Sequence, residues 1–179
     1  MALFREQADV SVRPATAEDE ASIARVQLRA WRSSHAELLG EEVLEHLDVT
    51  AVRAQWSRAI TAPPSPAHHV LVACDGARVV GFAASAPVEG GVEVVALEVD
   101  PDHQRGGHGS RLLTACVDLA RETGATHLQT WALDGDATRT RFLSSAGLGP
   151  DGVHRELGVG LAADGGTRSV AEHRWVAEI

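Results

Sequence analysis

Apolar residues recur along this chain with two different periods, which predict where strands and helices lie. Alternating or continuous runs of Val, Ile, Leu and Ala indicate strands, whereas apolar residues three or four positions apart indicate a helix with one buried face. The runs predict strands over residues 10–15, 68–76, 77–88, 91–100, 126–133, 151–159 and 167–179. The wider spacing predicts helices after Thr16, over residues 41–60 with a break near 48–50, from the glycine-rich stretch to Gly124, and over 136–147.

Local signals mark several of these boundaries. Thr16, with Asp19 three residues later, forms a capping pair that starts a helix. Asp75-Gly76 between two apolar runs is a strong hairpin signal. Gly124 follows the last apolar position of its helix, where glycine can adopt the left-handed conformation that ends a helix. The order of elements therefore predicts the α/β class, with a mixed central sheet of about seven strands and helices on both faces.

The strand over residues 91–100 is expected at the centre of the sheet. Its continuous Val, Ala and Leu content indicates cover on both faces. Regular alternation divides its side chains into two sets, Val95, Leu97 and Val99 on one face and Val94, Ala96 and Glu98 on the other. A carboxylate on a mostly apolar central strand is a candidate functional group, and the alternative is a structural salt bridge between Glu98 and an arginine.

Length and composition limit what the chain can be. With 179 residues it is expected to form one domain over residues 1–179 with a single core. A formal net charge of −9 argues against a nucleic-acid partner, and no apolar run approaches the ~20 residues that a membrane span requires. The opening stretch "MALFREQADV" lacks the apolar run of a secretion signal, which makes the cytoplasm the expected location.

Cysteine and histidine spacing does not predict a metal site. Cys74 and Cys116 are expected to be buried thiols, and a single bridge between them stays open as an alternative. The nine histidines show no helical i, i+4 pair and no accompanying cysteine, so no metal is expected. The chain also contains no Lys, Asn or Tyr, which removes several catalytic groups from consideration.

A glycine-rich stretch between a predicted strand and a predicted helix, "DPDHQRGGHGSRLL", indicates a ligand that the backbone approaches closely. A Walker loop requires a lysine, which this chain lacks. A dinucleotide fingerprint requires a glycine where Leu112 stands, and the flanking glycines of a nucleophile elbow around Ser110 are absent. The remaining pattern is Q-x-x-G-x-G, from Gln104 to Gly109.

This pattern resembles the central motif of the GNAT family, the acyl-CoA-dependent N-acyltransferases. The stretch "DATRTRFLSSAGL" is similar to a second segment of the family, N-A-x-x-x-x-F-Y-x-x-x-G-F, and the order of elements matches along the chain. The resemblance implies the GNAT fold and an acetyl-CoA-dependent N-acetyltransferase. Such an enzyme moves the acetyl group to a primary amine of a small molecule, protein or peptide, by direct transfer in a ternary complex. Relatives commonly dimerise, so a homodimer is a further expectation. The alternative is a non-catalytic acyl-CoA-binding or regulatory module.

The resemblance also implies which residues bind acetyl-CoA. Amide groups from Arg105 to Ser110 are expected to hold the diphosphate at the positive end of the following helix. The pantetheine arm is expected beside the backbone of residues 97–99, in a gap between this strand and the neighbouring strand over 126–133. The residues expected to contact the coenzyme are Leu97, Glu98, Val99, Gln104, Arg105, Gly106, Gly107, His108, Gly109, Ser110, Asp136 and Phe142.

Acetyl transfer requires a base for the amine, a donor for the oxyanion and an acid for the sulfur. Glu98 is the first candidate for the base, followed by Asp134 and His35, and the backbone N–H of Val99 is the family-based oxyanion donor. Trp31 and His35 are equally expected as packing residues. The chain departs from the family pattern at three positions, with Leu143 in place of a tyrosine acid, Asp136 in place of an asparagine and Trp131 in place of a glutamate base. Solvent or another residue then protonates the sulfur.

Overall fold

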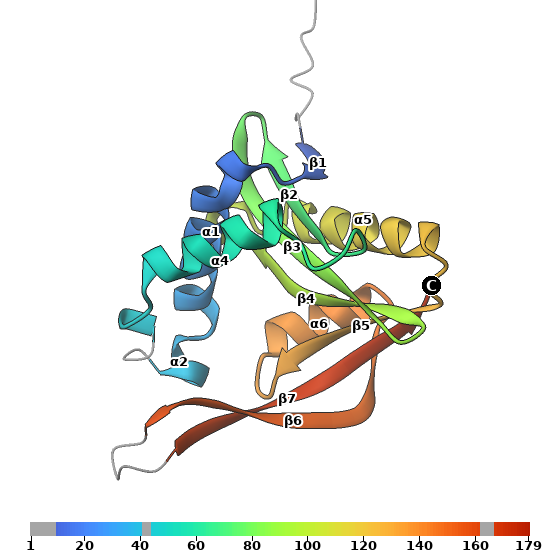
Figure 1. Cartoon of the computed structure of the whole chain (residues 1–179). Helices are drawn as coiled ribbons and strands as arrows, with labels where there is room; N and C mark the ends of the chain where they lie inside the picture. Colours follow the sequence, from blue (N-terminus) through green and yellow to red (C-terminus); the bar gives the residue numbers. More distant parts are fainter. Residues whose placement is uncertain (1–9, 41–43, 162–166) are drawn as a thin grey trace, which may run out of the picture.

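Seven strands form one mixed sheet in the computed structural model, which describes residues 10–40, 44–161 and 167–179 (Figure 1). The strands lie in the order β1-β2-β3-β4-β5-β7-β6. Their bounds are β1 Val10–Pro14, β2 His69–Asp75, β3 Arg78–Val88, β4 Gly91–Val99, β5 His127–Leu133, β6 Gly149–Leu161 and β7 Thr167–Glu178. Neighbouring strands are antiparallel except β4 and β5, which are parallel. The α/β class and the seven-stranded mixed sheet are therefore confirmed.

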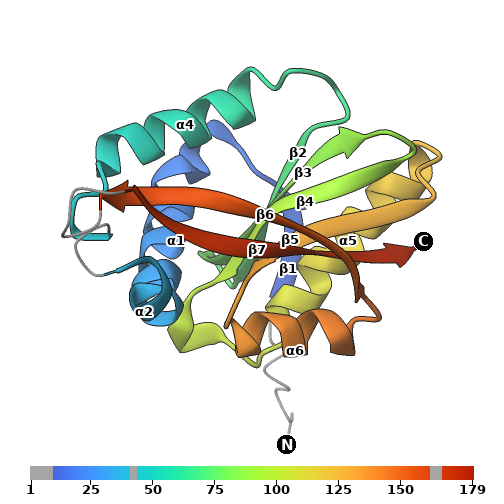
Figure 2. The ribbon, with the colours of Figure 1, turned by 90° about the horizontal axis from the view of Figure 1, so that it is seen from below.

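Helices cover both faces of this sheet, as the sequence predicts. They are α1 Glu20–Ser34, α2 Ala36–Leu39, α4 Val49–Thr61, α5 His108–Glu122 and α6 Ala137–Ser145, with single 3₁₀ turns at Ala17–Asp19 and Pro101–His103. α1 and α4 pack on one face, and α5 and α6 pack on the other; Figure 2 shows α4 and α6 on opposite sides of the strands. In the described part of the chain, no helix is long and apolar enough to cross a membrane.

Two apolar cores hold the layers together. Ile23 of α1 and Trp56 of α4 pack against Phe82 of β3, and the rings of Trp56 and Phe82 meet edge to face at 4.9 Å. On the other face, Leu112 of α5 and Leu143 of α6 belong to the second core. Full burial of one such side chain stabilises the fold by about 1.5–3 kcal/mol, so these contacts hold α1 and α4 against one face of the sheet and α5 and α6 against the other.

The two cysteines are buried and free, as expected. Cys74 belongs to the core under α1 and α4, whereas Cys116 belongs to the core under α5. The sheet lies between them, so the alternative of a bridge is not realised. Burial raises the pKa of the Cys116 thiol to about 12, which keeps it protonated and chemically inert.

Most of the predicted boundaries are found. Gly76 in the β2–β3 hairpin and Gly124 after α5 both have a positive φ, of 57° and 79°. The break predicted near residues 48–50 is the start of α4, where the Asp48 carboxylate accepts hydrogen bonds from the N–H groups of Thr50 and Ala51. Residues 41–43 of the predicted helix over 41–60 lie outside the described residues.

The predicted facing of the β4 side chains is wrong at Val94, because the strand contains a bulge, whereas Ala96 and Glu98 share one face as predicted, the face that α1 covers. Val94 and Ala96 lie opposite consecutive residues of β3, so Val95 is an extra residue in the ladder. An extra residue resets the alternation of the side chains beyond it. Val94 consequently packs with Leu97 in the core under α5 instead of sharing the face of Glu98. Val95 is 55% exposed, so the predicted cover on both faces is also absent at this point.

Candidate active site

The loop between β4 and α5 passes twice through the left-handed backbone conformation. Arg105 has a φ of 63° and Gly107 a φ of 78°, and α5 begins at the next residue, His108. The first N–H groups of a helix have no partner within the helix and form its positive end. Left-handed turns just before them direct successive amide groups to one side, which makes a concave anion site. The amides predicted to hold a diphosphate therefore lie at the start of α5.

The glycines of this loop differ in what they require. A Cβ at Gly107 would combine a positive φ with an approach of 2.9 Å to the guanidinium of Arg111, which itself donates to the Gly106 carbonyl at 2.9 Å. A Cβ at Gly109 would lie 3.5 Å from the Phe142 ring, an ordinary contact distance. The protein alone therefore has room for a small side chain at Gly109, and any stricter demand for glycine must come from a ligand.

The His108 side chain is turned away from solvent, so only the backbone of this residue is available to a ligand. Its side chain is buried at the start of α5, where desolvation lowers the pKa of the imidazole. Its Nδ1 has no hydrogen-bond partner among the described residues. The neighbouring residues of the loop are exposed to solvent and form the outer side of the concave site; they are Gln104 to Gly107 and Ser110.

A buried carboxylate ties this loop to α1. Asp100, the residue between β4 and the 3₁₀ turn, has no exposed side-chain surface and lies 3.1 Å from the guanidinium of Arg25 and 2.8 Å from that of Arg29. Arg25 also donates to the Val79 carbonyl at 2.9 Å, and Arg29 to the Asp102 carboxylate at 2.8 Å. The start of the loop is thus fixed to the helix on the opposite face of the sheet.

β4 and β5 separate before β4 reaches the glycine loop. Their parallel pairing runs from Gly91 and His127 to Val94 and Thr130, where the Thr130 hydroxyl donates to the Val94 carbonyl at 2.8 Å. β4 nevertheless continues to Val99. The gap that the family resemblance implies between these two strands is present.

The ladder with β3 directs main-chain groups of β4 into this gap. The N–H of Asp100 donates to β3 at 2.8 Å, and Glu98 lies opposite Phe82 in the same alternating series. In an antiparallel ladder the residues between such pairs point both of their main-chain groups away from the partner strand. Leu97 and Val99 therefore present their N–H groups to the gap between β4 and β5.

The end of α1 brings side chains to Glu98. The indole N–H of Trp31 donates to Glu98 Oε1 at 3.2 Å. One turn later, Nε2 of His35 lies 3.0 Å from Oδ2 of Asp136, whose other oxygen accepts from the backbone N–H of Arg139 and so caps α6. Two of the three predicted base candidates, Glu98 and His35, are thereby brought together with Asp136.

Burial controls the protonation of this cluster. Desolvation raises the pKa of Glu98, against the attraction of Arg139 and His35 and the hydrogen bond from Trp31. Burial would also raise the pKa of Asp136, but the hydrogen bonds from His35 and from the Arg139 N–H outweigh it and lower that pKa. Two neighbouring carboxyl groups are thus shifted in opposite directions, which is typical of sites that perform acid–base chemistry.

The third candidate, Asp134, lies apart from this cluster. Its side chain is 74% exposed and its Oδ1 is 3.7 Å from Nε2 of His173 on β7. Trp131, at the position where the family pattern has a glutamate, donates from its indole N–H to Glu93 at 3.2 Å. The guanidinium of Arg155 lies 4.0 Å from the centre of the Trp131 ring, a cation–π contact. None of these contacts directs Asp134 toward Glu98.

Sequence reasoning misses Arg139. Its Nη1 donates to the Leu97 carbonyl at 2.6 Å, so a guanidinium lies at the edge of the gap between β4 and β5. A signal was available in the sequence, because Arg139 stands one helical turn after Asp136 and one turn before Phe142. Three residues at that spacing share the face of α6 that meets the glycine loop and β4.

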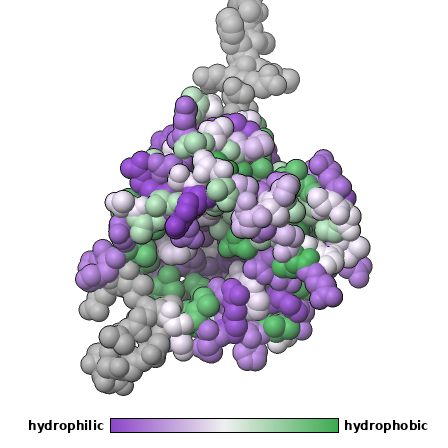
Figure 3. All heavy atoms as spheres, in the orientation of Figure 1, coloured by the Kyte–Doolittle hydropathy of each residue, from purple (hydrophilic) through white to green (hydrophobic). Residues whose placement is uncertain are grey.

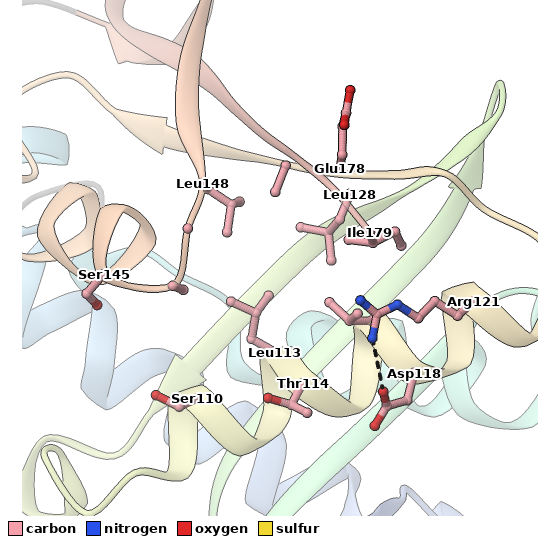
Figure 4. Close-up of a pocket in the computed structure, with 14 residues that line it drawn as sticks. Ser110, Leu113, Thr114, Asp118, Arg121, Leu128, Ser145, Leu148, Glu178 and Ile179 are labelled. Atoms are coloured by element: carbon pink, nitrogen blue, oxygen red, sulfur yellow. Dashed lines mark ion pairs between the residues drawn. The ribbon is translucent and has the colours of Figure 1, made fainter.

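A groove of about 520 Å³ lies along α5 (Figure 4). Ser110 at the start of α5 lines one end of it, and Arg121, which lies 3.9 Å from Asp118, lines it further along the helix. The end of α6 and the end of β7 form the opposite wall. The groove therefore continues from the glycine loop and lies away from Glu98.

The chain matches the acetyltransferase (GNAT) family over residues 26–147, more than half of its length. That match includes the glycine loop and α6. A curated relative is YuaI of Bacillus subtilis (strain 168), an uncharacterised N-acetyltransferase with 27% identity over 132 residues, which are 70% of this chain and 72% of the relative.

Solved acetyltransferases share the fold. The PaiA N-acetyltransferase of Thermoplasma acidophilum, in complex with coenzyme A, superposes with a TM-score of 0.75 and 13% identity over 96% of this chain and 99% of that one. YncA of Salmonella typhimurium, with its cofactor acetyl-CoA, superposes with a TM-score of 0.68 and 20% identity over 95% of this chain and 94% of that one. The chain therefore belongs to the acetyltransferase (GNAT) family, and it is an N-acetyltransferase that uses acetyl-CoA, as the resemblance implied.

Proposed function

We propose that this enzyme transfers the acetyl group of acetyl-CoA directly to a primary amine that is bound beside Glu98, within a ternary complex. One observation carries the proposal: a half-buried glutamate whose pKa is raised by desolvation lies on β4, next to the gap into which Leu97 and Val99 point their N–H groups. Base and oxyanion donor would then flank the same reacting carbon, and no covalent enzyme intermediate is needed.

The coenzyme fits the main-chain groups that the site offers. Amides from Arg105 to Ser110 would hold the diphosphate, because they surround the positive end of α5. The pantetheine arm would lie in the gap beside the backbone of residues 97–99, which leaves the Val99 N–H free for the acetyl carbonyl. Phe142 borders the same passage beside Gly109, and Gln104 reaches the Val99 carbonyl at 3.5 Å.

Asp136 has a different role from the asparagine that it replaces. Both carboxylate oxygens are engaged, one by His35 and one by the cap of α6. We propose that it orients His35 and starts α6, and that it makes no direct bond to the coenzyme. The nucleotide end of the coenzyme would instead follow the groove that begins at Ser110.

The residues then divide the reaction between them. Acetyl-CoA supplies an activated acetyl group whose carbonyl carbon accepts the amine nitrogen. Glu98 takes a proton from that nitrogen as the bond forms, directly or through one water. The Val99 N–H holds the negative charge that develops on the carbonyl oxygen, a contribution of about 3–4 kcal/mol for a preorganised donor.

Glu98 is preferred to the other base candidates on geometry. It takes part in none of the ion pairs found in residues 10–40, 44–161 and 167–179, so the alternative of a structural salt bridge lacks support. His35 is engaged with Asp136, and Asp134 is exposed on the far side of the cluster. We therefore assign the base to Glu98, with His35 as the group that faces it.

The acceptor amine is bound on the side of Glu98. Hydrophilic and hydrophobic residues are interspersed over the face of the molecule in Figure 3, which suits an amine on a mixed polar and apolar body. A single domain, a homodimer and a cytoplasmic location stay predictions from the sequence.

Release of the free thiol tests the activity. Purified protein, acetyl-CoA and panels of polyamines, aminoglycosides, amino acids and peptide N-termini are combined, and new thiol is measured with a disulfide reagent. At least one class should give amine-dependent thiol release that Gly109→Glu abolishes. Intact acetyl-CoA binding without release across the whole panel would contradict transfer and would favour the non-catalytic acyl-CoA-binding module.

A further inference from the structure

Arg139 lies where the reactive end of the coenzyme is expected. Its guanidinium donates to the Leu97 carbonyl at 2.6 Å, on the edge of β4 that faces the gap. Residues two apart on a strand are separated by roughly 7 Å, so this group lies within that distance along β4 of the proposed oxyanion donor at Val99. The cap from Asp136 to the Arg139 N–H, at 2.9 Å, fixes the first turn of α6 and with it the origin of the side chain.

The positive charge of Arg139 has no direct counter-ion. No carboxylate of the described residues lies within ion-pair distance of its guanidinium, although many of the chain's arginines form such pairs. The charged groups that act on it are Glu98 from β4 and Asp136 from the start of α6, and His35 from the end of α1 lies against Asp136. A half-buried guanidinium whose bond is to a neutral carbonyl is available to an anion.

The reaction produces an anion at this place, and the chain lacks the usual means to neutralise it. No tyrosine or lysine is present to protonate a departing sulfur. An arginine cannot serve as an acid at neutral pH, because its pKa is above about 12, but it can stabilise a negative charge without transferring a proton.

We propose that Arg139 stabilises the sulfur of coenzyme A as a thiolate while it leaves, in place of a proton donor. This inference rests on the proposed function. The bond between the amine nitrogen and the acetyl carbon forms, the bond between that carbon and sulfur breaks, and its electron pair stays on the sulfur beside Arg139. Glu98 holds the amine proton, and the thiolate takes a proton from water after release.

Binding measurements test this directly, without any turnover. If Arg139 favours the thiolate, coenzyme A should bind more tightly as pH rises from about 7 to about 10, whereas desulfo-coenzyme A, which lacks the sulfur, should not. The ratio of the two affinities should rise roughly tenfold for each unit by which the bound thiol's pKa is lowered. Calorimetric titrations of both compounds at several pH values give this ratio.

Three variants locate the effect. Arg139→Gln should abolish the rise of the ratio with pH, and Arg139→Lys, which keeps the charge, should retain part of it. Arg141→Gln removes an exposed arginine two residues further along α6 and should behave like the wild-type enzyme. Circular dichroism checks that each variant is folded. If Arg139→Gln does not fold, the reduced pH dependence of the affinity ratio in Arg139→Lys tests the inference instead.

Two outcomes would overturn the inference. An unchanged pH dependence in Arg139→Gln would show that the sulfur is not stabilised by this residue. An equal loss of affinity for coenzyme A and desulfo-coenzyme A, with no pH-dependent difference in the wild-type enzyme, would place Arg139 on the nucleotide or pantetheine part. Absence of any coenzyme binding by the wild-type enzyme would instead contradict the proposed function itself, which is a distinguishable result.

Discussion

At the scale of single residues, the environment of Glu98 determines what its carboxyl group can do. Trp31 donates one hydrogen bond to it, and its half-buried position removes part of the water that would otherwise stabilise its charge. A carboxylate in such surroundings binds a proton more strongly than an exposed one, which brings its pKa toward the pH at which an enzyme works. The same desolvation makes it a better base and a less stable charge.

Replacement of Glu98 by Gln should lower kcat/KM by roughly 10²- to 10⁴-fold, the usual contribution of a general base. In the wild-type enzyme kcat/KM should fall as pH drops through the pKa of Glu98, which lies above the usual glutamate range. That acidic limb should disappear in the variant. Glu93→Gln, a matched change on the same strand, should keep the limb; a wild-type profile for Glu98→Gln would transfer the role to His35 or Asp134.

A stability measurement on the same variant gives an independent check. Because the pKa of Glu98 is raised in the folded protein, its contribution to stability is present at low pH and is lost as pH rises through that pKa. The Tm of Glu98→Gln relative to the wild type should therefore increase as pH rises above about 4, the ordinary pKa of glutamate. A decrease over this range would mean that the carboxylate is stabilised, as in a structural ion pair.

At the scale of elements, α5 and α6 meet at the glycine loop, and each contributes its N-terminal end to the site. α5 offers free amides after Gly107, whereas the amides of α6 are capped by Asp136. The two ends are therefore not equivalent: one can bind an anion, and the other serves to hold side chains. Phe142 closes the distance between them beside Gly109.

Gly109→Glu should abolish acetyl-CoA binding and leave the protein folded. A carboxylate near the start of a helix does not weaken the helix, but here it would occupy the place of the diphosphate and repel it. Gly109→Ala is the control for folding, because its Cβ would meet the Phe142 ring at an ordinary 3.5 Å. Calorimetry and circular dichroism check both variants. Unchanged affinity of Gly109→Glu would show that the diphosphate binds elsewhere.

Asp136→Ala should cost about 1 kcal/mol of unfolding free energy at neutral pH, because α6 loses its cap. The pKa of Asp136 is lowered in the folded protein, so its stabilisation is present above the unfolded pKa of about 4 and is lost as pH falls further. Urea unfolding near pH 7 should show the difference, and near pH 3 it should shrink. Asp136→Asn, which can still cap, should be affected less; an equal loss at both pH values would exclude the carboxylate as its source.

At the scale of the whole molecule, Asp100 connects the two faces of the sheet. Arg25 and Arg29 reach it from α1, while its backbone begins the loop that leads to α5 on the other face. The helix that supplies Trp31 and His35 is thereby held in register with the coenzyme loop. Acceptor side and coenzyme side are linked through a single buried carboxylate.

Asp100→Asn should destabilise the protein by about 2 kcal/mol or more. Removal of one partner from a buried ion pair typically costs 3–5 kcal/mol, and the value here is reduced because the arginine side chains are 37% and 38% exposed. Asp102→Asn is the control, since that carboxylate is 69% exposed and solvent screens its ion pair, so its loss should destabilise the protein far less than the loss of Asp100. Equal Cm values for the two variants in urea would contradict this account.

The sequence predicts the local features of this molecule better than its long-range contacts. The Asp75-Gly76 turn, the break near residues 48–50 and the glycine loop are predicted correctly because each depends on neighbouring residues. The sequence does not predict the bulge at Val95, because the bulge arises from the ladder with β3 and leaves the apolar pattern of β4 unchanged.

The candidate site shows the same limit. The glycine loop and Glu98 stand out in the sequence because they break the pattern of an apolar strand. The hydrogen bond between Trp31 and Glu98 joins residues 67 positions apart, and the one between His35 and Asp136 joins residues 101 positions apart. Only packing of α1 and α6 against the sheet creates those contacts, so the spacing of residues does not predict the partnership of Trp31 with Glu98 or the bond from Arg139 to the Leu97 carbonyl.

The separation of β4 from β5 interrupts the hydrogen-bond ladder in the middle of the sheet. The two parallel strands pair only over their first few residues, and the amides beyond the paired part have no neighbouring strand to bond to. A pantetheine chain laid in that space would act as the absent neighbour and restore continuity from one half of the sheet to the other. The rigidity of this fold would thus depend on its own reactant, with the loaded enzyme stiffer than the empty one.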